Sequence, residues 1–495
     1  MFDKLSKINV SELKKWNISP NEIAYLKNKI LNDKLGLVLN FEEKDENLEN
    51  YYFGLEEVKE LHINPKEKNN HLLIEGDNYY ALKALQISGI KVDVIYIDPP
   101  YNTGNKDFIY NDNYVNKDDQ FKHSKWLSFM KKRLELAKEL LADDGVIFVS
   151  IDDNEHAYLK VLMDEIFGEE NFQNSIVWVS NRSGRQISNN LYTKTYEHIL
   201  VYSKNFEHDN ITFNRQYISE LMPLLYKETD IKIFKDEFST YILQYELHNQ
   251  NIKKFNSLTR PNLFYPIYTN GNVISLENKE NFIELLPPKQ KNIQGVWRWG
   301  KEKVSKEIHN LIIINKNGKY KIFPKKRNIV FSAKDLVLSS KINTKTGSKE
   351  MKELGLNFDY PKPSILIKYL IKNFKNSAII LDFFSGSGTT AQAVMELNEE
   401  DGGNRRFILC TNNENDIAQK ICRERIYRVI NGEGSKKEEI DWNFSKDKKS
   451  LINNSMKYLK VKSIDKVNGD YEEINNLKEI YKNEFNKDLS IKDFK

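Results

Sequence analysis

Apolar runs alternate with helical stretches in two separate parts of this chain. In the first part, "HLLIEGDNYYALKAL" joins an apolar run to a helical pattern through a Gly-Asp-Asn turn, and the β-branched runs "VDVIYID" and "VIFVSID" flank the helical "WLSFMKKRLELAKELLADDG", which is expected to end at Gly145. In the second part, "SAIILDFF", "SGSG", "TTAQAVMELN" and "RRFILC" repeat the strand, turn, helix, strand order. This alternation predicts an α/β fold with a doubly wound, Rossmann-like parallel sheet.

Composition sets broad limits on the class of protein. The 495 residues are 40% hydrophobic and 29% charged, as expected of a folded chain with several parts, and the formal charge of +4 shows no overall preference for nucleic acid. Cys410 and Cys422 have no metal-binding spacing, so we expect no metal site and a reducing compartment. No apolar run approaches the roughly 18 residues of a membrane span and the N-terminus lacks a signal-peptide pattern, so we expect a cytoplasmic protein without a membrane partner.

The texture of the sequence predicts five segments. Between about 179 and 354 the strand–helix alternation gives way to a stretch rich in Lys, Asn, Tyr and Phe, and after about 433 the chain is charged and weakly periodic. The predicted segments are an N-terminal helical arm (1–60), a first α/β half (61–178), an inserted domain (179–354), a second α/β half (355–432) and a charged C-terminal tail (433–495).

Two strand ends carry the residues suited to chemistry. Ligands of open α/β sheets bind at the carboxyl ends of the strands, where "DPPY" and "DFFSGSG" both lie. Gly386 and Gly388 allow close approach of the backbone to a ligand. The same turn is also compatible with a purely structural role, and with a nicotinamide cofactor whose ribose is held by Glu414.

The tetrapeptide at residues 98–101 favours another chemistry. Adenine N6 is a poor nucleophile because its lone pair is delocalised into the ring, and two acceptors placed on the amino protons would draw the pair back onto nitrogen. Asp98 offers a carboxylate oxygen, the Pro99 carbonyl is fixed in direction by Pro99 and Pro100, and Tyr101 offers a face for stacking, worth about 1–3 kcal/mol. A rigid loop with a solvated acid is the alternative interpretation.

These motifs together resemble a known family. The chain is similar to S-adenosylmethionine-dependent DNA adenine-N6 methyltransferases, especially the modification (Mod) subunits of type III restriction–modification systems, through "IEGDNYYALKAL", "DPPYNTGNKDFIYND", "GVIFVSIDDNE", "RPNLFYPIY", "GVWRWGKEKV", "YPKPSILIKYLI" and "DFFSGSGTTAQAVMELN". "DPPY" precedes the glycine turn by 382 − 98 = 284 positions. This order resembles the permuted β class, whose target-recognition domain lies between the two halves.

The resemblance assigns roles to individual residues. It implies a catalytic loop of Asp98, Pro99, Pro100 and Tyr101. It implies a cofactor pocket lined by Asp77, Asn78, Lys362, Pro363, Asp382, Phe383, Phe384, Ser385, Gly386, Gly388 and Thr389, with one of Asn412, Asn413 and Glu414 on the ribose. Asp77 is equally suited to cap a helix, and Lys362 to lie in solvent.

Recognition is less legible in the sequence. A stacked base cannot reach such a pocket, so the target adenine is expected to flip out of double-stranded DNA, with Phe108, Tyr110, Asn111 and Asp112 of "FIYND" closing over it or joining the core. Candidate DNA contacts in the insert are Arg182, Arg185, Arg260, Arg298 and Lys301. One of Trp297 and Trp299 is expected to be core, and His123, His156 and His198 are expected to be structural.

Several alternatives stay open at this stage. Cytosine-N4 methylation needs a similar loop but usually has Ser in place of Asp98, and enzymes acting on RNA or protein glutamine usually have Asn there. A DNA-binding specificity protein with a decayed site is the alternative that is not an enzyme. The resemblance implies a homodimer able to assemble with a helicase–nuclease restriction subunit, or else a solitary methyltransferase.

Overall fold

The computed structural model describes most of the chain from Tyr51 onward. The described residues are 51–67, 69–105, 107, 109–110, 113–183, 191–205, 220–226, 233–290, 292–327, 333–444, 449–466 and 471–494. The helices expected before residue 50, the "FIYND" residues Phe108, Asn111 and Asp112, and Arg185 lie outside these ranges. Among the described residues no helix combines the length and apolarity needed to cross a membrane.

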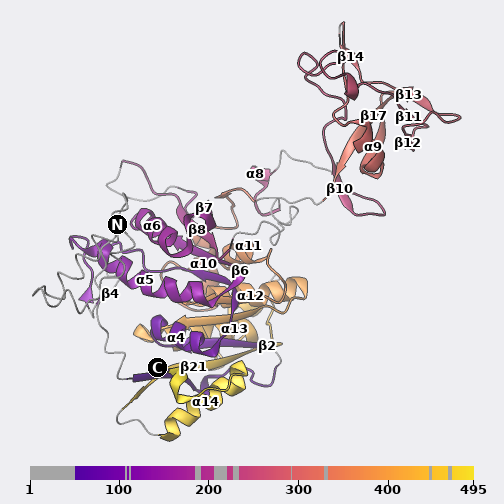
Figure 1. The fold of residues 1–495 in the computed structure, drawn as a ribbon. Helices are drawn as coiled ribbons and strands as arrows, with labels where there is room; N and C mark the ends of the chain where they lie inside the picture. The colour runs from indigo at the N-terminus through magenta and orange to yellow at the C-terminus, as the bar shows by residue number, and fades with distance from the viewer. Residues whose placement is uncertain are drawn as a thin grey trace, which may run out of the picture.

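A mixed sheet forms the centre of the molecule (Figure 1). Its parallel middle has the spatial order β21, β2, β20, β19, β3, β6, and antiparallel pairs join β1 to β21 and β8 to both β6 and β7. The ten strands found in the described residues are, across the sheet, β1 (Tyr51–Glu57), β21 (Asn454–Asp465), β2 (Asn69–Glu75), β20 (Arg406–Thr411), β19 (Ile379–Asp382), β3 (Val92–Ile97), β6 (Leu141–Ile151), β8 (Glu197–Ser203), β7 (Phe172–Trp178) and β18 (Leu336–Val337).

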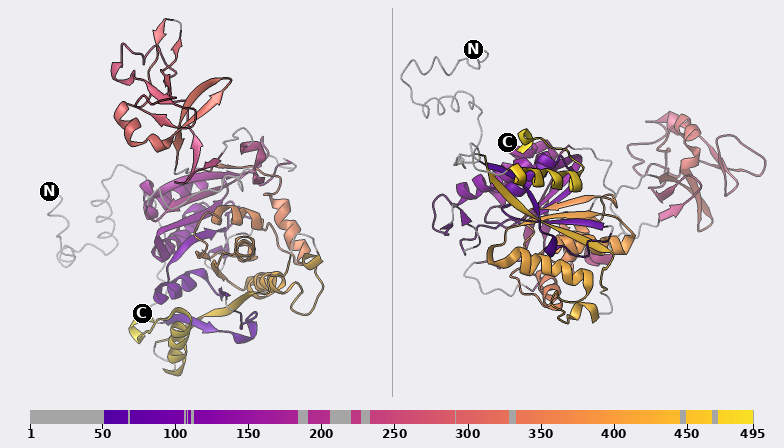
Figure 2. Two further views of the ribbon diagram at one scale, coloured as in Figure 1. Left: turned by 90° about the vertical axis from the view of Figure 1, so that its right-hand side faces the viewer. Right: turned by 90° about the horizontal axis from the view of Figure 1, so that it is seen from below.

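Helices cover both faces of this sheet (Figure 2). One face packs against α4 (Asn78–Ser88), α5 (Lys122–Leu140), α6 (His156–Phe167) and α14 (Tyr471–Phe485). The other packs against α10 (Thr344–Glu353), α11 (Ser364–Ile371), α12 (Thr389–Asp401) and α13 (Glu424–Asn431). Helix α5 ends at Leu140, earlier than the predicted Gly145, because the chain turns into strand β6 at Leu141.

The β-branched composition of the central strands follows from burial on both faces. In β3, Val94 and Tyr96 enter the core on one side of the sheet, while Ile95 and Ile97 enter the core on the other. A strand that is covered on both faces needs apolar side chains at every position rather than at alternate ones. The doubly wound fold predicted from the sequence is therefore confirmed.

The two halves of the α/β fold meet at the middle of the sheet. Strands β19 and β3 are direct parallel neighbours, with Ile380 opposite Val94 and Leu381 opposite Ile95. The chain leaves β19 toward β20 on one side and β3 toward β6 on the other, so the switch point of the sheet lies between them. Asp382 and Asp98, 284 positions apart in sequence, thus emerge at the same edge of the sheet.

The inserted domain is smaller than predicted. Strand β8 and helix α10, both inside the predicted 179–354 segment, belong to the central sheet and its covering layer. Residues 233–327 instead form a separate unit with its own core, which includes Leu247, Trp297 and Ile322. Its elements are β9 (Ile233–Lys235), β10 (Thr240–Leu243), β11 (Ile267–Thr269), β12 (Ile274–Ser275), β13 (Ile283–Leu285), β14 (Lys289–Gln290), β15 (Ile293–Gln294), α9 (Lys301–Lys306), β16 (Leu311–Lys316) and β17 (Lys319–Lys326).

Both predicted terminal segments contribute a strand to the central sheet. The C-terminal stretch is no detached tail, because β21 pairs in parallel with β2 and α14 buries Leu477 and Tyr481 in the core. The predicted N-terminal arm ends in strand β1, which pairs antiparallel with β21 across the whole of Tyr51–Glu57. These pairings join residues about 400 positions apart, which local sequence patterns do not report.

Candidate active site

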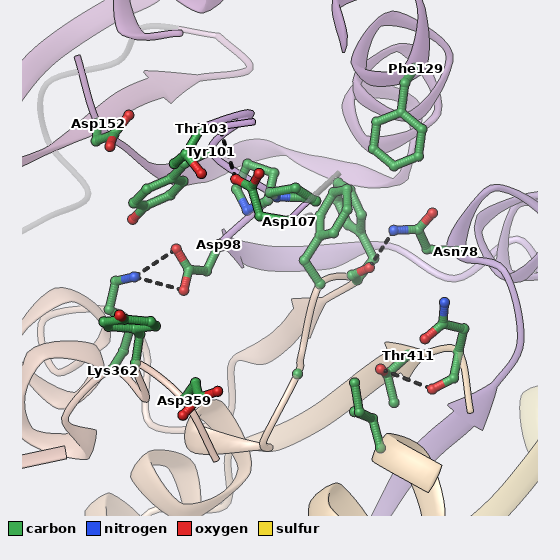
Figure 3. Close-up of a pocket in the computed structure, with 18 of the residues that line it drawn as sticks. Asn78, Asp98, Tyr101, Thr103, Asp107, Phe129, Asp152, Asp359, Lys362 and Thr411 are labelled. Atoms are coloured by element: carbon green, nitrogen blue, oxygen red, sulfur yellow. Dashed lines mark hydrogen bonds and ion pairs between the residues drawn. The ribbon is translucent and has the colours of Figure 1, made fainter. Parts of the chain in front are cut away.

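A cleft of about 1500 Å³ opens at the carboxyl edge of the sheet (Figure 3). Residues that follow β3, β19, β20 and β2 all line it, as do residues from β8 and from the segment before α11. Typical ligand pockets have about 300–1,000 Å³. The cleft therefore has room for two ligands side by side.

Asp98 lies in this cleft as one half of an ion pair. The Nζ atom of Lys362 is 2.8 Å from Oδ1 and 2.7 Å from Oδ2 of Asp98 (Figure 3). Burial raises the pKa of Asp98, and the ammonium of Lys362 opposes this rise. Burial alone would lower the pKa of Lys362, but the carboxylates of Asp98 and Glu197 outweigh it and raise that pKa. The raised pKa of Lys362 keeps the lysine charged. Its ammonium in turn favours the ionised form of Asp98.

Tyr101 is held at its hydroxyl end. The hydroxyl donates to Oε2 of Glu197 at 2.9 Å, and the Lys362 ammonium lies 5.0 Å from the centre of the ring. Burial, together with the charges of Asp98 and Glu197, raises the pKa of Tyr101 well above its usual value. The tyrosine therefore stays a neutral donor with an oriented ring.

Hydrogen bonds with α5 and with residues before α6 hold the loop that follows β3. The Trp126 indole donates to the Pro100 carbonyl at 2.7 Å, and Asn102, in the left-handed region at φ 57°, donates through its amide to Glu155 at 2.6 Å. Glu155 also contacts Nδ1 of His123 at 2.7 Å. These bonds fix the direction of the residues that follow Asp98.

The turn between β19 and α12 has a backbone conformation that favours glycine at two positions. Gly386 and Gly388 have φ angles of +47° and +77°, which side chains disfavour, and a Cβ at Gly388 would meet Sγ of Cys422 at 3.0 Å. Asp382 accepts from the Thr390 hydroxyl at 2.5 Å and from the Phe384 amide at 3.1 Å. Burial raises the pKa of Asp382 to about 7.

The predicted cofactor residues divide into two sets by their place in the structure. Those on the cleft surface are Asp77, Asn78, Lys362, Phe383, Phe384, Gly386 and Glu414. The others, which lie behind that surface in the turn or at the helix starts, are Pro363, Asp382, Ser385, Gly388 and Thr389. The four residues predicted to be catalytic, Asp98, Pro99, Pro100 and Tyr101, all line the cleft.

Asp77 has a structural role besides its place on the cleft. It caps α4 by accepting from the Tyr79 amide at 2.7 Å, and it pairs with Arg133 at 3.0 Å. Its neighbour Asn78 donates to the carbonyl of Phe383 at 2.8 Å, which ties the start of α4 to the end of β19.

The end of β20 offers hydroxyl-binding groups. Asn412 and Glu414 line the cleft and contact each other at 3.3 Å. The side chain of Asn413 instead accepts from the backbone of Gln419 at 3.2 Å. Of the three residues that the sequence left unresolved, two thus face the cleft.

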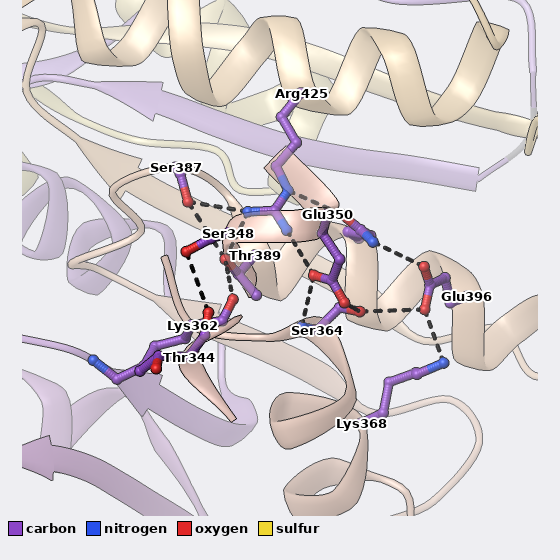
Figure 4. A network of polar contacts seen from close by, with 11 residues as sticks. Thr344, Ser348, Glu350, Lys362, Ser364, Lys368, Ser387, Thr389, Glu396 and Arg425 are labelled. Atoms are coloured by element: carbon purple, nitrogen blue, oxygen red, sulfur yellow. Dashed lines mark hydrogen bonds and ion pairs between the residues drawn. The ribbon is translucent and has the colours of Figure 1, made fainter. Parts of the chain in front are cut away.

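Behind the glycine turn lies a buried polar network centred on Arg425 (Figure 4). Its guanidinium donates to the hydroxyls of Ser387 at 3.0 Å and Thr389 at 2.7 Å, and it pairs with Glu350 at 3.3 Å. Thr389 in turn donates to the Lys362 carbonyl at 3.2 Å. The network therefore connects the glycine turn to the segment that carries the partner of Asp98.

The sequence did not single out several residues of the cleft. Glu197 at the start of β8 was hidden because that strand was assigned to the insert. Tyr360 lines the cleft, is 88% exposed and has a φ of +56°, a conformation rare for tyrosine. Its place directly before "PKPS" was a signal that could have been used.

The candidate histidines and the candidate residues that the structure describes in the predicted insert lie outside the cleft. His156 stacks on His198 with ring centres 3.8 Å apart, and neither lines the cleft, nor does His123. In the insert, Trp297 is 4% exposed and its indole donates to the Tyr265 carbonyl, which confirms that one of the two tryptophans is core. The basic residues outside this core are exposed at Arg182, Arg260, Arg298 and Lys301.

The chain is similar to known DNA methyltransferases. A family model described as DNA methylase matches residues 92–424. The chain is 34% identical over 394 residues to the type III restriction–modification enzyme EcoPI Mod subunit of Escherichia phage P1, covering 71% of this chain and 59% of that protein. It is 36% identical over 408 residues to the StyLTI Mod subunit of Salmonella typhimurium, covering 74% and 58%.

Two further matches differ in coverage and strength. The type II methyltransferase M.KpnI of Klebsiella pneumoniae is 35% identical over 399 residues, which cover 77% of this chain and 90% of that protein. Among solved structures, the cytosine-N4-specific PvuII DNA methyltransferase matches with a TM-score of 0.36 and 12% identity, over 72% of this chain and 86% of that one. Thus the chain spans less than two thirds of the two Mod subunits but most of M.KpnI.

Proposed function

Because the chain belongs to the DNA methylase family, we propose that it transfers a methyl group from S-adenosylmethionine to N6 of adenine in double-stranded DNA. One observation carries this proposal: the paired Asp98 of "DPPY" and the glycine turn of "DFFSGSG" open onto the same cleft. The first supplies an acceptor for an amino group, and the second a place for a nucleoside cofactor.

The residues of the cleft fit S-adenosylmethionine. Gly386 brings backbone to the surface at a φ of +47°, Phe383 and Phe384 offer apolar walls, and Asn412 and Glu414 offer acceptors for ribose hydroxyls. When bound, the cofactor supplies the methyl group: the bond from N6 to carbon forms as the bond from carbon to sulfur breaks, with its electron pair left on sulfur. No redox partner is required for that exchange.

The chain's own residues prepare and neutralise the amino group. Asp98 and the Pro99 carbonyl each accept a hydrogen bond from one of the two amino protons, and these bonds shift the lone pair toward N6. The Asp98 carboxylate then takes up the proton that N6 releases after it is methylated. Tyr101 stacks against the flipped base, and this stacking offsets part of the cost of flipping, which is a few kcal/mol. The carboxylate at the first position favours adenine over cytosine.

The insert suits a DNA partner. Residues 233–327 hold 17 Lys and Arg against 8 Asp and Glu, a formal charge of +9, whereas the rest of the chain holds 58 against 63, or −5. A compact basic domain with its own core provides the phosphate contacts that position an enzyme on a duplex. We assign target recognition to this unit, and with DNA as substrate we place the enzyme in the cytoplasm.

Two assignments of partner follow from the comparisons. The similarity to Mod subunits supports a modification subunit that acts as a homodimer with a restriction subunit. The coverage of M.KpnI, 90% of its length, supports a methyltransferase that works without such a partner.

The test is methyl transfer from labelled S-adenosylmethionine to DNA of random sequence, followed by digestion to nucleosides. We expect N6-methyladenine from the wild type and none from Asp98→Ala, with Glu399→Gln, an exposed change on α12, as the matched control. Label in N4-methylcytosine instead would reassign the base, and no transfer with the cofactor bound would refute the proposal.

A further inference from the structure

The Lys362 ammonium occupies the place that a substrate amino group must take. It contacts both carboxylate oxygens of Asp98, at 2.8 and 2.7 Å. Adenine N6, like the ammonium, is a nitrogen that donates protons, and under the proposed function it must donate to the same carboxylate. N6 needs only one of these oxygens for its hydrogen bond, but N6 gains positive charge during the transfer, so a cation held on the same carboxylate opposes the reaction and the lysine is expected to give way when the base enters.

Glu197 is the nearby group able to receive it. Its Oε2 atom lies 3.5 Å from Nζ of Lys362 and accepts the Tyr101 hydroxyl at 2.9 Å. The Lys362 side chain is only 9% exposed, so water is a poor alternative partner for its charge. A small rotation of the lysine toward β8 would exchange one carboxylate for the other.

We propose that Glu197 is a positioning residue of the methyl transfer: it takes the Lys362 ammonium when the amino group of the target adenine displaces that ammonium from Asp98. This inference rests on the proposed function and extends it to a residue outside "DPPY" and the glycine turn. In the free enzyme Lys362 pairs with Asp98 and favours its ionised form. When the target adenine is bound, Lys362 pairs with Glu197 instead.

The charges explain why the exchange favours the reaction. N6 becomes positive as its bond to carbon forms, and an ammonium still on Asp98 would repel that charge across a few ångströms of a poorly solvated cleft. On Glu197 the ammonium is neutralised by a separate carboxylate, and Asp98 is left to accept the N6 proton. Glu197 also holds Tyr101, so the same side chain orients the ring on which the base stacks.

Two substitutions separate these roles. Glu197→Gln keeps an oxygen that can accept the Tyr101 hydroxyl but removes the charge that receives Lys362. Lys362→Met removes the group that must move, while its backbone carbonyl, which accepts from Thr389, remains. The assay is N6-methyladenine formation with kcat and KM for DNA, followed as a function of pH, so that a further rise in the pKa of Asp98 in Lys362→Met is separated from the loss of the group that moves.

We expect the effects of the two substitutions on kcat/KM to be non-additive in a double-mutant cycle. Glu197→Gln should lower kcat/KM for DNA about 10-fold when Lys362 is present, and less than about 2-fold in the Lys362→Met background. Cofactor affinity, measured by calorimetry, should stay within about 2-fold in Glu197→Gln, because that change does not touch the glycine turn, and kcat/KM is compared at saturating cofactor in every variant because Lys362 lines the same cleft. Tyr101→Phe should reproduce little of the Glu197→Gln loss, since its ring remains, and Lys345→Met, an exposed change on α10, is the control.

The other outcomes are decisive. If Glu197→Gln costs the same in both backgrounds, or nothing in either, Glu197 does not act through Lys362. No transfer by Lys362→Met at any pH of the profile would also overturn the inference, because a group that must leave Asp98 cannot be essential once that carboxylate is ionised. A wild type that methylates no DNA refutes the proposed function itself, whereas an active wild type with an uncoupled cycle refutes only the role of Glu197.

Discussion

Replacing Arg425 by methionine should destabilise the protein and weaken cofactor binding through one buried network (Figure 4). The side chain of Arg425 is fully buried and donates to Gln392 at 2.9 Å besides Ser387, Thr389 and Glu350. Burial lowers the pKa of Arg425, and the Glu350 carboxylate opposes that change, so the guanidinium stays charged. Two hydroxyls of the glycine turn lose their donor in the variant.

The magnitude follows from the ion pair. Glu350 is 6% exposed, and removing one partner of a buried pair typically costs about 3–5 kcal/mol of unfolding free energy. Glu350→Gln keeps an oxygen for the Ser364 amide, which donates to Oε2 at 3.0 Å, and its side-chain amide can donate to the Ser364 hydroxyl, which contacts Oε1 at 2.8 Å. The double variant should therefore be more stable than the sum of the single losses by about 1–3 kcal/mol.

Urea unfolding followed by tryptophan fluorescence measures these effects. Arg425→Met should lower the midpoint by on the order of 1 M, and the double variant should recover part of the shift. Calorimetry with S-adenosylmethionine measures the second consequence, a weaker affinity. Additive losses within about 0.5 kcal/mol, or unchanged cofactor affinity in a folded single variant, would refute the reasoning.

Four further outcomes are expected. Asp98→Asn should lower kcat about 10²–10³-fold in the methyl-transfer assay with cofactor binding retained, and equal loss of both would contradict the role of its charge. Because burial raises the pKa of Asp98 and the reaction needs its carboxylate, activity should fall as pH falls through that raised value, and Lys362→Met should move this acid limb of the kcat/KM profile to higher pH. His71 is buried between Asn454 and the Phe407 amide, and burial lowers its pKa from 6.5 to about 4. The folded state therefore binds the proton less well than the unfolded state, and the free energy of unfolding should decline by about 3 kcal/mol from pH 6.5 to 4. Urea midpoints measured against pH test this, and a flat profile would contradict it. Replacing residues 233–327 by a short linker should abolish the salt-dependent affinity for DNA in filter binding but keep cofactor affinity; Ile233 and Lys326 both pair with Ile242, so the ends to be joined are about 10 Å apart.

Local patterns in the sequence were enough for the parallel core and the two halves of the site. Strands β3 and β19 are apolar except at Asp93 and the terminal Asp382, because both of their faces are buried, and turns rich in Gly, Pro and Asp follow them. Such signals are contained within about 15 consecutive residues, so they survive without knowledge of the fold. "DPPY" and "DFFSGSG" could be assigned to strand ends for that reason.

The outer strands were not predictable in the same way. Strand β21 carries Lys457, Lys460 and Lys462 and reads as a charged tail, yet it lies between β1 and β2 because its apolar side chains complete the core. Strand β8 reads as part of the insert because the chain before and after it is irregular. Edge and antiparallel strands depend on partners far away in sequence, and a local pattern does not name the partner.

The sequence by itself determined which chemical groups exist at the ends of two strands: an acid fixed by two prolines, an aromatic ring, and a glycine turn with room for a ligand. Only the tertiary structure decided how these groups are paired. It placed Lys362 on Asp98 and Glu197 on Tyr101, and it connected Arg425 to the glycine turn, across separations of 264, 96 and 36 positions. Charge pairing acts over a few ångströms of space, whatever the distance along the chain, and so it appears only once the sheet has brought these strand ends together.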